Sequence, residues 1–169
     1  RAWGAKDTGA VALGWPHIRG YGQGQRDVKP SNLMLTSSGQ VKGLGLCVAR
    51  LVNTPGRAGQ ITSPGQFLGT LEYMAPEQCD DSHAVDTRAD IYSLGCTLYH
   101  LLTGNPPFTA PGFVTPYQKL RAHAEVHAPP LSERRSDIAE QLGTVVARML
   151  AQDRDGRFAT PAEHVAALH

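Results

Sequence analysis

Apolar residues recur at helical spacing over the second half of the chain, and one long segment shows the pattern without interruption. Thr87 is the expected N-cap of this helix, and Gly104 and Pro106 are expected to end it. Few charged residues follow Asp90, so we expect the helix to be buried on all sides. Its apolar positions are Ile91, Leu94, Leu98, Leu101 and Leu102.

Three further helices are expected from the same kind of evidence. One runs from about Thr115 to Ala124, and a second is capped by Ser136 and presents a single apolar face. The last has Thr160 as N-cap, Pro161 in its first turn and Glu163 as the capping-box partner. The apolar face of the second consists of Ile138, Leu142, Val145, Val146, Met149 and Leu150.

Two short apolar runs earlier in the chain predict a β-hairpin. They span residues 33–35 and 41–44, and the turn-forming residues 37–40 lie between them. Residues 52–70 are rich in Thr, Ser, Pro and Gly and predict a long surface loop, whereas residues 1–24 predict an irregular lead-in. The predicted fold class is therefore mainly α with a small β-hairpin.

Composition limits the classes of function. A chain of 169 residues that is 41% hydrophobic can build one sizeable core, and a net charge of +1 argues against a nucleic-acid partner. Cys47, Cys79 and Cys96 are odd in number and widely spaced, which indicates a reducing compartment and no disulfide framework. No membrane segment or signal peptide is visible, so we expect a cytoplasmic protein. Because the first residue is Arg1, we expect a processed chain or a piece of a longer one.

Candidate chemistry is concentrated between Gln25 and Asn32. Asp27 offers a carboxylate that can take a proton, Lys29 can neutralise phosphate, and the amide oxygen of Asn32 can bind a metal ion. The spacing matches the catalytic loop of protein kinases, in which His-Arg-Asp is followed by four residues and Asn. Gln25 stands in the His position.

From Asp27 onward the chain resembles the C-terminal lobe of a bacterial-type Ser/Thr protein kinase. Four segments carry the resemblance in the family order: residues 26–32, 69–77 and 90–95, and the pair Asp153 and Arg157. The resemblance implies a kinase-like C-terminal lobe over residues 25–169 that lacks the N-terminal lobe, with residues 1–24 as a remnant of the preceding helix. Within the lobe it implies a catalytic loop and hairpin (25–44), an activation segment (45–77) and a helical subdomain (78–169).

The resemblance also implies an activity, the transfer of the ATP γ-phosphate to Ser or Thr of protein substrates, with Mg2+ as the metal ion. Asp27 would accept the proton of the substrate hydroxyl, and Lys29 would stabilise the transferred phosphoryl group. Asn32 would hold Mg2+, and Met34 would lie against the adenine. Thr70 would hydrogen-bond to Asp27 and Lys29 and favour Ser/Thr substrates.

Scaffold roles follow from the resemblance in the same way. Glu77 and Arg157 would form a buried ion pair, and Asp90 would accept hydrogen bonds from the catalytic-loop backbone. Thr62 and Ser63 would be the candidate phosphorylation sites of the activation segment.

Departures from the family pattern limit the expected activity. The family places a metal-binding Asp where this chain has Gly45, which leaves Asn32 as a poor substitute ligand. The first glutamate is Glu72 and the only lysine before Asp27 is Lys6, so the N-terminal-lobe residues that hold ATP are missing. We therefore expect the chain alone to be inactive. The alternatives are a pseudokinase-like interaction module that binds other proteins, and a non-functional gene remnant.

Two other features have less specific patterns. His123 and His127 could share a helix face and bind a metal ion, but no third ligand is apparent, so surface histidines are expected. Cys47 lies near Lys42 and Arg50, and an inert cysteine is favoured over a reactive thiol.

Overall fold

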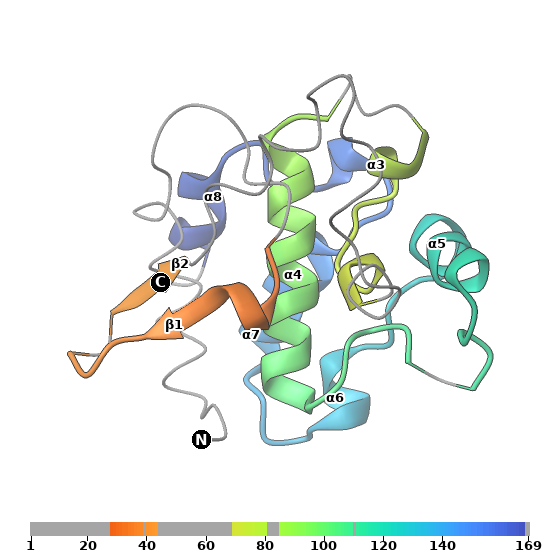
Figure 1. Cartoon of the computed structure of the whole chain (residues 1–169). Coiled ribbons are helices and arrows are strands. Elements are labelled where there is room, and N and C mark those ends of the chain that lie inside the picture. The colour runs from red at the N-terminus through yellow and green to blue at the C-terminus, as the bar shows by residue number, and fades with distance from the viewer. Residues whose placement is uncertain (1–27, 39, 44–68, 81–84, 110, 168–169) are drawn as a thin grey trace.

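A computed structural model of the chain describes residues 28–38, 40–43, 69–80, 85–109 and 111–167 (Figure 1). The predicted lead-in, the catalytic loop up to Asp27 and residues 45–68 of the predicted activation segment lie outside the described residues. The described part is mainly helical with one two-stranded antiparallel sheet, which confirms the predicted fold class.

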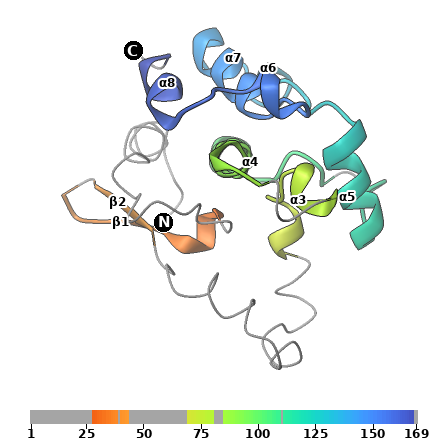
Figure 2. The same ribbon diagram turned by 90° about the horizontal axis from the view of Figure 1, so that it is seen from above.

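Helix α4 (Thr87–Thr103) runs through the centre of the molecule (Figure 1). Viewed along its axis in Figure 2, it has α6, α7 and α8 on one side, α3 and α5 on another and the hairpin on a third. Most of its side chains are buried, as the scarcity of charge predicts. The N-cap is Asp86 and not Thr87, because the Asp86 carboxylate accepts the backbone N–H of Arg88 at 2.8 Å. Gly104 ends the helix in the left-handed conformation, with φ of 82°.

Close packing against α7 (Glu140–Met149) explains a glycine in the middle of α4. A Cβ atom at Gly95 would lie 2.9 Å from Cβ of Met149 and 3.2 Å from Cδ2 of Leu150. Such distances would force the two helices apart, so Gly95 sets how closely they approach. The buried core includes Leu94, Leu98, Val145, Val146, Met149 and Leu150.

The remaining helices test the predicted boundaries. Helix α5 (Pro116–Glu125) has Thr115 as its N-cap in a capping box, close to the expected range. Helix α7 begins at Glu140 without a side-chain cap, so the prediction of a cap at Ser136 is wrong. Helix α8 (Pro161–Ala166) has the predicted cap Thr160, which accepts the backbone N–H of Glu163 at 3.4 Å. Helices α3 (Glu77–Asp80) and α6 (Leu131–Arg134) were not predicted.

The predicted hairpin is present. Strand β1 (Leu33–Leu35) pairs antiparallel with β2 (Val41–Gly43), with Met34 opposite Lys42. A short 3-10 helix, η1 (Pro30–Asn32), precedes β1, and a second, η2 (Arg154–Gly156), follows α7. Within the predicted loop of residues 52–70 the structure describes only residues 69 and 70, which are helical. In the described residues, none of the helices is long and apolar enough to cross a membrane.

Candidate active site

A hydrogen bond joins two distant segments of the predicted site. Lys29 precedes η1 in an extended conformation, and its Nζ donates to Oγ1 of Thr70 at 2.9 Å, across 41 positions of sequence. Pro30 restricts the backbone at the first position of η1. The structure therefore places the Lys29 ammonium next to the start of the 69–77 motif, as the family resemblance implies, whereas the bond from Thr70 to Asp27 stays a prediction.

The backbone before Lys29 is attached to the central helix. Val28 is buried, and its carbonyl accepts a hydrogen bond from Oγ1 of Thr97 on α4 at 3.2 Å. A buried carbonyl without a partner would be unfavourable, so this bond helps to fix the position of the loop. A threonine inside an apolar helix has no distinguishing spacing, so this role of Thr97 could not be predicted from the sequence.

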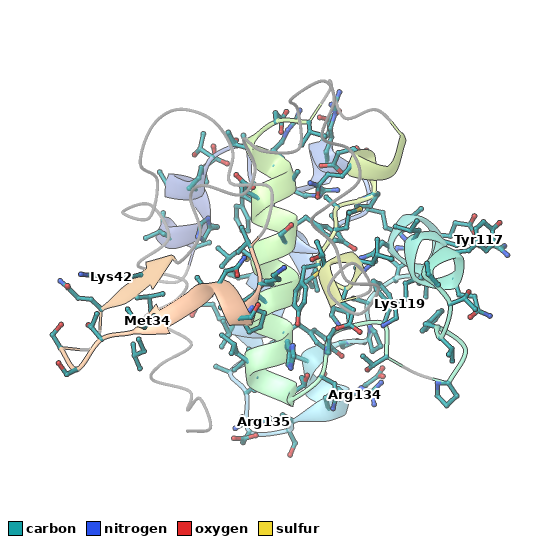
Figure 3. All side chains as sticks on the ribbon, viewed as in Figure 1. Met34, Lys42, Tyr117, Lys119, Arg134 and Arg135 are labelled. Carbon is teal, nitrogen blue, oxygen red and sulfur yellow. The ribbon has the colours of Figure 1, made fainter. Side chains whose placement is uncertain are left out.

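Asn32 and Met34 lie next to this loop at the start of the hairpin. Asn32 is the last residue of η1, and its backbone N–H donates to the Lys29 carbonyl at 2.9 Å. Met34 on β1 is 45% exposed, and Figure 3 shows it with Lys42 on the hairpin, away from α5. A thioether exposed on this strand could lie against a flat apolar ring. The predicted adenine contact stays a prediction.

The segment after Thr70 is held by its side chains. Leu71 is buried, and the hydroxyl of Tyr73 lies 2.6 Å from Nδ1 of His100 on α4. Burial raises the pKa of Tyr73 and lowers the pKa of His100. Glu72 points to α5, where its carboxylate pairs with the ammonium of Lys119.

Glu77 and Arg157 form a bidentate ion pair. The two guanidinium Nη atoms donate to the two carboxylate oxygens at 2.7 and 2.9 Å, and the Arg157 side chain is completely buried. Asp90 is also buried, in the first turn of α4. Its predicted partner is the catalytic-loop backbone of residues 26–32, of which residues 26 and 27 lie outside the described residues, and this contact stays a prediction.

Four predicted site positions cannot be placed. Asp27, Gly45, Thr62 and Ser63 all lie outside the described residues. Among the residues that the structure does describe, no cluster of three His, Cys, Asp or Glu side chains could hold a metal ion. Since glycine has no side-chain oxygen, the predicted metal position 45 offers no carboxylate, and the residues present do not make up the predicted Mg2+ site.

His123 corrects the expectation of a surface histidine. It is 1% exposed on the inner face of α5, and its Nδ1 lies 2.7 Å from the hydroxyl of Tyr92 on α4. Burial lowers the pKa of His123 to about 4, with a smaller contribution from the charge of Lys119. His127 is exposed, as expected. His123 is therefore a buried, neutral packing residue. Only its position on the inner face of α5 distinguishes it from a surface histidine.

Comparison with known proteins identifies the family of this chain. The family described as "Protein kinase domain" matches residues 10–167, which is nearly the whole chain. The chain belongs to the protein kinase family. The match begins before Asp27, so the likeness extends into the part of the chain that carries no recognisable motif.

The relatives are bacterial serine/threonine kinases. Serine/threonine-protein kinase PknB of Mycolicibacterium smegmatis and that of Mycobacterium tuberculosis are each 39% identical over 153 residues, covering 90% of this chain and 23% of theirs. Probable serine/threonine-protein kinase PknB of Bifidobacterium longum is 37% identical over 139 residues, covering 82% and 19%. The chain is thus a kinase-family member of the bacterial Ser/Thr type, and it spans less than a quarter of the length of these curated relatives.

Proposed function

We propose that this chain is the substrate-side lobe of a protein serine/threonine kinase, an enzyme that transfers the γ-phosphate of ATP to Ser or Thr of other proteins. The hydrogen bond from Lys29 to Thr70 is the observation that carries the proposal. It brings a phosphate-neutralising ammonium together with a hydroxyl from the segment that would receive the substrate. We also propose that the substrate is a protein, that the location is cytoplasmic and that the chain has no nucleic-acid partner.

The residues present suit particular parts of phosphoryl transfer, which depends mainly on positioning and charge stabilisation. Asp27 would accept the substrate proton, and it directly precedes Val28, whose carbonyl is bonded to α4. Lys29, oriented by Thr70, would stabilise charge on the transferred group. Met34 would contact the adenine, and Asn32 would contribute one oxygen to Mg2+.

Catalysis by these 169 residues alone is not expected. Mg2+ would supply charge neutralisation on the phosphates, and Gly45 offers no carboxylate that would hold it. A neutral amide at Asn32 binds Mg2+ less strongly than a carboxylate. We therefore assign the phosphoryl-transfer chemistry to the family and to the whole protein, and we predict no turnover for the isolated chain.

A second candidate function is a protein-interaction module. Tyr117 and Val114, at the start of α5, are 71% and 67% exposed, and Figure 3 shows Tyr117 pointing away from the body of the molecule. Tyrosine is among the residues enriched at protein–protein interfaces. A lobe with Gly45 could keep this surface and bind proteins without catalysis.

A transfer assay separates these functions. The purified chain is incubated with Mg2+, labelled ATP and a basic protein substrate beside Asp27→Ala, and equal background signals are expected. Transfer that depends on Asp27 would refute the predicted inactivity.

Thermal shift with Mg-ATP then tests nucleotide binding, since a ligand at 100 times its Kd adds about 2.7 kcal/mol of stability. Loss of Ser-peptide binding in Thr70→Val would support the substrate-side lobe, whereas no binding to the unmodified chain would contradict it.

A further inference from the structure

The inner face of α5 carries a buried lysine. The buried residues of this helix are Lys119, Ala122 and His123, and the Lys119 side chain is only 9% exposed. Its ammonium is paired with the carboxylate of Glu72, which is 24% exposed. Lysine is rarely buried unless it is paired, because removing its charge from water is unfavourable. The location of Lys119 therefore depends on Glu72.

Helix α5 is itself held in place near Lys119. One turn further on, His123 contacts the hydroxyl of Tyr92 on α4 at 2.7 Å, and its ring packs edge-on against Phe108 with centroids 4.8 Å apart. Both partners are buried. Lys119 thus projects from a helix that is fixed to the central helix, and Figure 3 shows it on the side of α5 that faces the body of the molecule.

The segment that Lys119 contacts is short and tied on both sides of Glu72. Two residues before it, Thr70 accepts the hydrogen bond of Lys29, and one residue after it, Tyr73 reaches His100. Within the segment the backbone N–H of Tyr73 donates to the Thr70 carbonyl at 3.2 Å. Movement of Glu72 would therefore move the turn that presents Thr70 to Lys29.

We propose that Lys119 is a positioning residue for the contact between Lys29 and Thr70, where the substrate hydroxyl would be received. Through Glu72 it holds residues 70–73 in the conformation in which Thr70 meets Lys29. The importance of that contact rests on the proposed kinase function, but the positioning itself is independent of catalysis. Without Lys119, the Glu72 carboxylate would be better hydrated in solvent than in its partly buried position beside α5. The turn of residues 70–73 is therefore expected to open locally while α4 stays folded.

Amide hydrogen exchange tests this directly. In Lys119→Met, exchange at the Tyr73 and Met74 amides should accelerate about tenfold or more, while the amides of α4 keep their protection. Glu72→Gln, at a less buried position, should give the same local effect if the first variant folds poorly. Arg121→Met is the matched control, because it removes the exposed ion pair with Glu125 from the same helix.

The outcomes distinguish this proposal from the kinase function. Local acceleration in Lys119→Met that Lys119→Arg reverses supports the positioning role, whether or not the chain binds a peptide or transfers phosphate. Unchanged exchange at Tyr73 and Met74, or equal acceleration there and throughout α4, would overturn it. Failure of the peptide-binding and transfer assays would instead count against the proposed function alone.

Discussion

Replacing Arg157 by methionine should cause a large loss of stability. All five N–H groups of its guanidinium are used, and the side chain is fully buried. Two bonds go to the carboxylate of Glu77, and three go to the backbone carbonyls of Arg88, Ala151 and Gln152, at 3.1, 2.7 and 2.9 Å. One side chain therefore connects α3, the start of α4 and the segment after α7.

The magnitude follows from what the substitution leaves behind. Methionine fills part of the volume but leaves the Glu77 carboxylate, 16% exposed, without its guanidinium partner. Breaking one side of a buried ion pair costs about 3–5 kcal/mol. The contact of the guanidinium with the Tyr92 ring, 4.7 Å from its centroid, is lost as well. We expect a loss of about 4 kcal/mol, a large part of the roughly 5–15 kcal/mol that stabilises a domain.

Urea denaturation followed by circular dichroism would measure this loss, and a thermal midpoint roughly 10 °C lower is expected. Arg121→Met removes an ion pair of similar chemistry from the exposed surface of α5 and should leave the midpoint unchanged. The double variant Glu77→Gln with Arg157→Met should lose less than the sum of the single variants. A loss in Arg157→Met no larger than in the Arg121 control would refute the reasoning.

Two further predictions concern protonation and packing. Acidification from pH 7 to 4.5 should remove about 2.5 kcal/mol through His123: its folded pKa is about 4 against an ordinary 6.5, so the unfolded chain binds a proton that the folded chain excludes. Urea titrations should give a weaker pH dependence for His123→Gln than for wild type or His127→Gln, and equal slopes would contradict this. Gly95→Ala should destabilise by about 1–3 kcal/mol because its Cβ would meet Met149, whereas Gly143→Ala on α7, with open space, should stabilise by about 0.5–1 kcal/mol. Similar midpoints for these two glycine variants would show that the approach of α4 and α7 is not the limiting factor.

Helix boundaries could be predicted where local chemistry decides them. The capping box of Thr115 and Gln118 needs only neighbouring residues, and α5 begins where expected. Ser136 has equally suitable chemistry, yet α7 begins at Glu140. The reason is tertiary: Arg135 donates to Asp137 at 2.9 Å and to the Leu102 carbonyl at 3.1 Å, which holds this turn against the end of α4.

The site residues also divide into those that sequence motifs indicate and those that depend on tertiary contacts. Lys29 and Thr70 belong to motifs with fixed spacing, so their sequence positions indicated the chemistry before the structure brought them together. Thr97, Lys119 and His123 act through contacts with other elements, and a threonine, lysine or histidine on a helix does not indicate such contacts from sequence. Periodicity could have placed Lys119 and His123 on one face of α5, but not the identity of the segment packed there.

The residues that stabilise this fold are different from those predicted to take part in phosphoryl transfer. The Glu77–Arg157 ion pair and the close packing of α4 and α7 at Gly95 contribute to the fold, and the structure contains both. Gly45 stands where the family resemblance predicts a metal-binding carboxylate, and the absence of that carboxylate need not weaken the scaffold. A well-folded chain is therefore no evidence of turnover. The Lys29–Thr70 contact can persist in an inactive lobe, and only transfer that depends on Asp27 would show that the chemistry persists as well.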